Sequence, residues 1–208
     1  MRIATWNVNS IKARLSTVLE VLGAIECDVV CLQELKCETD GFPYMELEEL
    51  GWTCAVHGQK SYNGVAILSK YPLDDIQKGL STMEDDQSRY IEALVMAETP
   101  IRVGAIYLPN GNPAPGLKYD YKLEWMEALE GHARQLLKQE EAFVLCGDYN
   151  VIPGINDSWD ETVWAEDALA LPETRQAFRR LRNLGLTDVF DMCDGRAHQY
   201  TFWDYQGG

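Results

Sequence analysis

Asp148 and Asn150 are two polar side chains at alternate positions, directly after the apolar run 143–146 and Gly147. In an extended segment, residues two apart point to the same side, so both side chains can face one ligand while Tyr149 faces away. A carboxylate is a hard oxygen ligand that suits Mg²⁺, and an amide can donate to a phosphate oxygen. The alternative is that the strand simply ends in a turn, where Asp and Asn are common because they hydrogen-bond locally.

Three further predicted strands also end in polar or amphipathic groups. These groups are Asn7, Glu34, and Tyr107 with Asn110. Apolar strands that deliver such groups at one end build a shared site above the edge of a buried sheet. We therefore expect the four strand ends to meet in one site.

The residue types of this expected site match phosphate-ester chemistry assisted by a divalent cation. Glu34 offers a hard oxygen ligand for Mg²⁺, which Asn7 and Asp148 support, and the cation would offset charge that develops on a leaving oxygen. Tyr107 can donate to a phosphate, or attack it when ionised. Each group also has a structural alternative, since Glu34 can cap the segment that follows it and the others can form turns.

The elements that would carry these side chains begin with a strand over 3–9, a helix, and a strand over 28–34. This order suggests a crossover unit with parallel strands, although the two strands can also pair antiparallel. The helix is indicated by apolar residues at the i, i+3, i+4, i+7 spacing, which are Leu15, Val18, Leu19 and Leu22.

Further along the chain, predicted strands and helices follow one another. We expect two hairpins, one with Asn63-Gly64 in its connection and one across 98–100, and a buried strand over 143–146. The other predicted elements are a short helix near 44–50, strands over 52–57, 65–69, 91–97 and 101–108, a helix around 125–136, a helix over 173–184 that Gly185 ends, and a short strand or 3₁₀ turn over 186–190.

Composition limits the class of protein. A chain of 208 residues with 46% hydrophobic residues can bury a sizeable core, and we expect residues 1–208 to form one domain. The net charge of −15, from 33 acidic against 18 basic residues, counts against broad, charge-driven binding of nucleic acid but not against a local basic groove. The sequence has no run of about 18 apolar residues, which argues against a membrane-spanning helix.

The six cysteines include no C-x-x-C pair and indicate reduced thiols rather than disulfides or a zinc site. The segment 1–6 lacks the apolar region of a signal peptide. We therefore expect a cytoplasmic protein without a membrane partner.

Seven short segments carry a family resemblance; they are 5–11, 32–36, 57–60, 63–69, 107–111, 147–150 and 201–205. The specific part is Tyr-x-Pro-Asn-Gly at 107–111 together with Gly-Asp-x-Asn at 147–150. By these segments the chain resembles the exonuclease III family of apurinic/apyrimidinic (AP) endonucleases, within the wider endonuclease/exonuclease/phosphatase superfamily. The segments occur in the family's order and cover essentially the whole chain, and the specific part separates this branch from the inositol-phosphatase and sphingomyelinase branches.

The resemblance implies an α/β fold, a four-layer α/β sandwich in which two mixed β-sheets lie face to face with helices outside. It also implies a DNA repair enzyme that cleaves the DNA backbone 5′ of abasic sites and trims 3′ ends, with Mg²⁺ or Mn²⁺ as its cofactor. Its partner would be double-stranded DNA with abasic sites or 3′ ends, and the protein would be a monomer.

The resemblance further assigns roles to residues at the strand ends. Glu34 would be the main metal ligand, with Asn7, Asp148 and Asn150 contributing to the metal site. Asp148 would orient or deprotonate the attacking water, or protonate the leaving group. Asn150 would hold the scissile phosphate, and Tyr107 would support the phosphate or the nucleophile.

Four residues would contact the DNA by the same resemblance. Arg89 matches a basic residue that contacts the DNA strand, and Asn110 would also touch the DNA. Phe202 and Trp203 match an aromatic pair that packs against the abasic sugar, although family members commonly carry Trp at the first of these positions. The alternative for both aromatic residues is packing in the core.

The sequence departs from the family at its C-terminal end. Family members continue for several tens of residues, with an Ile-Asp-His strand and a Ser-Asp-His segment that supply a histidine base and two aspartates. This sequence ends at Gly208, and His57, His132 and His198 match neither position. We therefore expect a domain truncated at its C-terminus, lacking the C-terminal strands, with impaired stability and catalysis. Two alternatives to a nuclease stay open: a non-catalytic DNA- or metal-binding remnant, and a phosphoesterase of the same superfamily that acts on another substrate.

Overall fold

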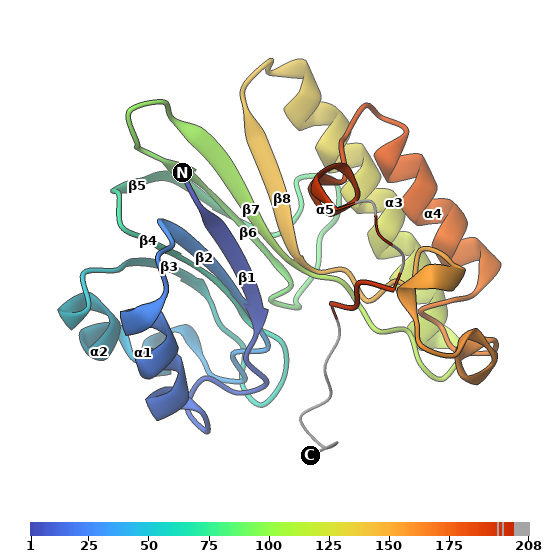
Figure 1. Ribbon diagram of the computed structural model, residues 1–208, viewed down its shortest axis with the longest axis horizontal. Helices are drawn as coiled ribbons and strands as arrows, with labels where there is room; N and C mark the ends of the chain where they lie inside the picture. The colour runs from blue at the N-terminus through green and yellow to red at the C-terminus, as the bar shows by residue number, and fades with distance from the viewer. Residues whose placement is uncertain (195, 197, 202–208) are drawn as a thin grey trace. The chain divides into compact units, whose positions relative to one another are not determined.

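A computed structural model describes residues 1–194, 196 and 198–201 of the protein (Figure 1). It contains two four-stranded β-sheets. Contacts between residues divide the chain into two units. Unit 1 contains residues 1–108 and 134–149, and unit 2 contains residues 109–133 and the chain from 150 onward. Both sheets lie in unit 1.

Sheet A has the strand order β1-β2-β4-β3. β1 and β2 are parallel, and β4 runs antiparallel to both β2 and β3. The parallel pair is joined through α1, so the predicted strand-helix-strand segment is a crossover unit. The bounds are β1 (Ile3–Asn7), α1 (Leu15–Ala24), β2 (Val29–Gln33), β3 (Thr53–His57) and β4 (Val65–Ser69).

Sheet B has the strand order β5-β6-β7-β8. β6 and β7 pair antiparallel, as expected for the second hairpin, and β5 pairs antiparallel with β6. β7 and β8 are parallel and place Tyr107 opposite Asp148. Both sheets are therefore mixed. The bounds are β5 (Leu73–Lys78), β6 (Tyr90–Val95), β7 (Ile101–Tyr107) and β8 (Phe143–Asp148).

The two sheets share an apolar core. The central strands β2 and β4 bury every residue, because alternate side chains face the other sheet on one side and helices on the other. The core between the sheets contains Val29, Cys31, Ala55, Val65, Ile67, Ile91, Ala93, Val95, Val103 and Ala105. The outer face of sheet A packs against α1 and α2 (Tyr44–Glu49) through residues that include Val18, Leu22, Val30, Leu32, Leu47, Ala66 and Leu68. A 3₁₀ turn, η1 (Thr39–Gly41), precedes α2.

Unit 2 is helical and contains most of α3. Its α4 begins with a proline in the first turn, a position where the missing N–H costs nothing. Its buried side chains include Tyr119, Trp125, Met126, Leu129, Ala168, Ala177 and Leu181. The bounds are α3 (Leu117–Lys138), η2 (Ile155–Asp157), η3 (Glu161–Trp164), α4 (Pro172–Arg182) and α5 (Val189–Cys193).

The predicted fold class is confirmed: this is an α/β protein with two mixed sheets and helices. Three local expectations differ. β5 was not predicted, an α-helix that begins at Val189 replaces the short strand or 3₁₀ turn expected over 186–190, and β8 is only half-buried. β8 is an edge strand, and no described residue pairs with its outer edge. All six cysteines are free, and no helix of the described chain is long and apolar enough to span a membrane.

Candidate active site

The structure brings Asn7, Glu34 and Asp148 together in unit 1. The side-chain nitrogen of Asn7, Nδ2, donates to Glu34 Oε1 at 2.8 Å and to Asp148 Oδ2 at 2.9 Å. One amide nitrogen therefore holds two carboxylates, one from each sheet. We call these three residues the carboxylate site.

The sheet topology explains why these side chains meet. Asn7 is the last residue of β1 and Glu34 follows the last residue of β2, so parallel pairing puts both at the same edge of sheet A. Asp148 is the last residue of β8, which lies against β1. The backbone N–H of Asn9 donates to Asn7 Oδ1 at 3.0 Å and orients the amide with its nitrogen toward the carboxylates.

The segments after β1 and β2 adopt backbone conformations that side chains usually avoid. The φ angles are 43° at Asn9, 88° at Ser10, 54° at Glu34 and 53° at Lys36. Such residues cost about 1–3 kcal/mol each and gather at functional sites. The two segments hold each other in place, since Ser10 N donates to Glu34 O at 2.7 Å.

Lys36 lies beside the carboxylate site, although the sequence analysis gave it no role. Its ammonium group lies 2.9 Å from Glu34 Oε2 and donates to Asn9 Oδ1 at 2.5 Å. Burial alone would raise the pKa of Glu34, but hydrogen bonds from Asn7, Lys36 and Tyr107 and the charge of Lys36 outweigh it and lower that pKa. Glu34 is therefore ionised at neutral pH. In the sequence, Lys36 could be connected with the site only because it lies in the family-like segment 32–36.

Tyr107 donates its hydroxyl to Glu34. Burial, followed by the charge of Glu34 and this hydrogen bond, raises the pKa of Tyr107 well above its ordinary value. The phenol is thus neutral at physiological pH. The sequence left two roles open for Tyr107, to donate a hydrogen bond to a phosphate or to attack it as an ionised tyrosine. This environment favours the hydrogen-bond donor.

Arg89 lies over the ring of Tyr107, with its guanidinium carbon 5.1 Å from the ring centroid. Arg89 Nε donates to Gln87 Oε1 at 2.9 Å, and Arg89 Nη1 donates to Tyr107 O at 3.3 Å. Gln87 Oε1 also accepts from the buried Asn63 at 3.1 Å. Gln87 and Asn63 therefore hold the predicted DNA-contacting arginine beside the site, a role that sequence reasoning missed.

Asn110 and Asn150 lie in unit 2 and contact each other. Asn110 Nδ2 donates to Asn150 Oδ1 at 3.2 Å. Asn150 follows Asp148 by two residues in the chain and has a φ of 46°. We call these two residues the amide pair; their side-chain NH₂ groups are donors suited to phosphate oxygens.

The other predicted residues lie elsewhere. Phe202 and Trp203 are outside the described residues. His57 is on β3, separated from β1 by two strands, and its Nδ1 lies 3.1 Å from Tyr90 O. Burial lowers the pKa of His57. His132 is buried in α3.

The carboxylate site fits a divalent cation by the chemistry of its donors. Glu34 and Asp148 each place an oxygen within 3 Å of one atom, Asn7 Nδ2, and carboxylate oxygens are the ligands that Mg²⁺ prefers. In this orientation Asn7 offers a donor rather than an oxygen, so it holds the two carboxylates. Among the described residues, no group of three or more His, Cys, Asp and Glu side chains could hold a metal ion.

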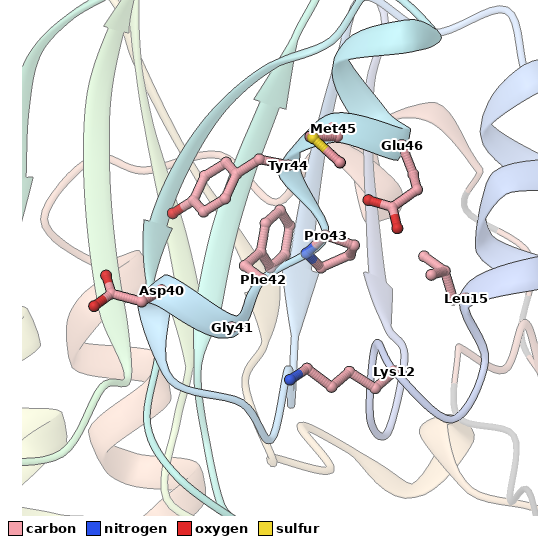
Figure 2. A pocket seen from close by; sticks show the side chains of 9 residues that line it. All are labelled: Lys12, Leu15, Asp40, Gly41, Phe42, Pro43, Tyr44, Met45 and Glu46. Atoms are coloured by element: carbon pink, nitrogen blue, oxygen red, sulfur yellow. The ribbon is translucent and has the colours of Figure 1, made fainter.

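The cavity drawn in Figure 2 is a different feature. It has a volume of about 510 Å³ and lies beside η1, with Phe42, Pro43 and Tyr44 on one side and Leu15 and Lys12 on the other. Neither Glu34 nor Asp148 lines it. The candidate active site is the edge where β1, β2 and β8 end, and this cavity is separate from it.

Comparison with known families and curated proteins gives matches along nearly the whole chain. The model of the Endonuclease/Exonuclease/phosphatase family matches residues 4–207. Exodeoxyribonuclease of Bacillus subtilis is 30% identical over 214 residues, which cover 100% of this chain and 82% of the relative. Exodeoxyribonuclease III of Haemophilus influenzae is 28% identical over 220 residues, covering 99% of this chain and 81% of the relative.

Solved structures are also similar. An AP endonuclease from Archaeoglobus fulgidus has a TM-score of 0.93 at 33% identity, covering 99% of this chain and 79% of the other. A 3′ phosphatase from Neisseria, bound to a product DNA hairpin, has a TM-score of 0.93 at 38% identity, covering 100% of this chain and 80% of the other.

Proposed function

Because the chain belongs to the endonuclease/exonuclease/phosphatase family, in its exonuclease III and AP endonuclease branch, it is a hydrolase of the nuclease class. We propose that it is a Mg²⁺- or Mn²⁺-dependent DNA repair nuclease that cuts the backbone 5′ of abasic sites and trims 3′ ends. The observation that carries the proposal is the carboxylate site, where Asn7 holds one carboxylate from each sheet.

Glu34 and Asp148 would hold the cation. A bound Mg²⁺ or Mn²⁺ supplies Lewis-acid stabilisation of negative charge on the phosphate and on the leaving oxygen. Lys36 and Asn7 keep Glu34 ionised, because both donate hydrogen bonds to its carboxylate. Asn7 also fixes the separation of Glu34 from Asp148.

Asp148 accepts a proton from the attacking water in this proposal. The water oxygen forms a bond to phosphorus while the bond from phosphorus to the 3′ oxygen breaks. The products are a 3′ hydroxyl and a 5′ phosphate. The departing 3′ oxygen takes up a proton from a solvent water, and Asp148 then returns its own proton to solvent. A positioned general base of this kind contributes about 10²–10⁴-fold.

The remaining residues would bind the substrate. Asn150 holds the scissile phosphate, and Asn110 contacts the DNA beside it. The neutral Tyr107 has a single O–H, which donates to Glu34 in the structure, and on substrate binding it would turn this O–H to the phosphate. Arg89, fixed by Gln87, supplies a positive charge for the DNA strand. DNA phosphates would meet this positive charge locally, so DNA binding is compatible with the net charge of −15 of the whole protein.

A second candidate activity is removal of a 3′ phosphate, and the similarity to the Neisseria 3′ phosphatase at 38% identity favours it. The same groups would serve, because attack of water on a terminal phosphate also releases a 3′ hydroxyl. We propose that the protein is a monomer that acts on double-stranded DNA in the cytoplasm. The six free cysteines support the cytoplasmic location, because thiols stay reduced there.

The test uses a fluorescent duplex with a tetrahydrofuran abasic analogue, and a nicked duplex with a 3′ phosphate. Both are incubated with Mg²⁺ or with EDTA. We expect Mg²⁺-dependent cleavage that falls at least about 100-fold in Glu34→Gln and Asp148→Asn. Glu20→Gln, an exposed carboxylate on α1, is the matched control and should cut like the wild type.

Two results would contradict the proposal. Hydrolysis of inositol phosphates with both duplexes left intact would place the substrate outside DNA. Binding of the abasic duplex in a gel-shift assay, without turnover at any protein concentration, would indicate a non-catalytic remnant.

A further inference from the structure

Lys122 on α3 has no exposed surface, although lysine is almost never fully buried. Its ammonium nitrogen, Nζ, donates to the backbone oxygen of Asn110 at 3.0 Å and to that of Asn150 at 2.6 Å. All three residues belong to unit 2. The two acceptors are the backbone carbonyls of the amide pair.

Burying this ammonium group is costly unless hydrogen bonds compensate. The compensation here comes from carbonyl oxygens of two segments that are 40 residues apart in the chain. One segment follows β7 and the other follows β8. A single buried side chain thus joins the backbones of two segments whose side chains meet above it, with Nδ2 of Asn110 3.2 Å from Oδ1 of Asn150.

Packing leaves Lys122 little room to move. Gly111, with a φ of 92°, passes over its aliphatic part so closely that an added Cβ would lie 2.6 Å from Lys122 Cδ and 3.1 Å from Ala168 Cβ. One helical turn further along, Trp125 is also buried. The Lys122 side chain is therefore held in one conformation, unlike a flexible surface lysine, whereas Asn110 is exposed to solvent.

We propose that Lys122 is a positioning residue for the amide pair. By binding both carbonyl oxygens with one ammonium group, it sets the spacing of the two segments, so that the Asn110 and Asn150 side chains face the same phosphate. The inference rests on the proposed function in assigning phosphate binding to these amides. The contacts of Lys122 themselves do not depend on it.

The test is a double-mutant cycle on the abasic duplex, with Lys122→Met, Asn150→Ala and the double variant. We expect Lys122→Met to lower kcat about 10- to 100-fold, with KM changed less than threefold. In the Asn150→Ala background the same change should cost less than about threefold, because Lys122 acts through Asn150. Lys118→Met, on the exposed part of the same helix, should match the wild type.

Hydrogen exchange supplies a readout that does not require turnover. In Lys122→Met we expect faster exchange in segments 108–112 and 149–152, with the strands of sheet A unchanged. If that variant does not fold, Lys122→Gln replaces it in both measurements. An equal loss of kcat in both backgrounds, or unchanged exchange in the two segments, would overturn the inference. A wild-type protein that leaves the duplex intact would refute the proposed function, while the exchange result would still decide the role of Lys122.

Discussion

Replacement of Gly147 by alanine should damage the fold and the site together. Gly147 lies opposite Ile106 in the parallel pair β7–β8 and has a φ of 153°. An added Cβ would lie 2.0 Å from Ile106 O and 2.7 Å from Ile106 N. Both neighbours are backbone atoms, so relief requires β8 to move away from β7.

The magnitude follows from two contributions. Forcing extra atoms into a packed site costs about 1–3 kcal/mol, and placing a side chain at this φ costs about 1–3 kcal/mol more. The sum of roughly 2–6 kcal/mol is a large part of the ~5–15 kcal/mol that stabilises a typical domain. For a chain of this size each kcal/mol shifts the melting temperature by about 2–4 °C, so we expect a fall of roughly 4–24 °C.

The assay is urea unfolding followed by tryptophan fluorescence, with abasic-duplex cleavage measured on the same samples. Gly79→Ala is the matched control, since Gly79 also has a positive φ, 77°, but an added Cβ meets nothing within 4 Å. The control should lose only about 1 kcal/mol. Activity of Gly147→Ala should fall as well, because Asp148 is the next residue. Equal urea midpoints for the two variants would refute the close approach of β8 to β7.

Three further predictions concern the carboxylate site. Glu34→Gln should weaken Mg²⁺ binding, measured by calorimetric titration, at least about tenfold, while its melting temperature stays within a few degrees of the wild type. Unchanged Mg²⁺ affinity with a large drop in melting temperature would show that Glu34 supports the fold and does not bind the metal. The folded-state pKa of Glu34 is lowered, so the ionised side chain stabilises the fold above the unfolded-state pKa of about 4.3, and this stability is lost as the pH falls through the lower folded-state pKa. The difference in free energy of unfolding between wild type and Glu34→Gln should therefore shrink below about pH 4. A difference that stays constant from about pH 6 to about pH 3 would contradict this. Because the pKa of Tyr107 is raised, ionisation of this phenol should not lower wild-type activity below about pH 10. A fall in activity near about pH 8 that disappears in Tyr107→Phe would show that the tyrosine ionises there, which contradicts the raised pKa.

Much of the fold could be predicted because its strands and helices carry strong hydrophobic patterns. β2 and β4 are continuous apolar runs, which is typical of strands covered on both faces. β5 was missed because its sequence, Leu-Asp-Asp-Ile-Gln-Lys, does not alternate, and five of its six residues are exposed. An edge strand of this kind is held by backbone pairing with β6, with an irregularity between Asp74 and Gln77.

The site was predicted in part, for a physical reason. Polar residues that directly follow apolar strands are visible in the sequence, and this pattern identified Asn7, Glu34 and Asp148. Lys36 and Lys122 were missed because charged residues in loops and helices usually face water. The burial of Lys122 depends on carbonyl groups 12 and 28 residues away in the chain, and local periodicity carries no information on such contacts.

The use of two edge strands gives the carboxylate site its precision. β1 and β8 each have a parallel neighbour, and these pairings fix Asn7 beside Gln33 and Asp148 beside Tyr107. The apolar core between the sheets holds the two edges together, so the Asn7 amide can span them with hydrogen bonds of 2.8 and 2.9 Å. A site placed on strands supported by a core keeps its geometry better than a site placed on loops. The backbone strain at Glu34 and Asn9 is tolerated because this frame over-determines their positions.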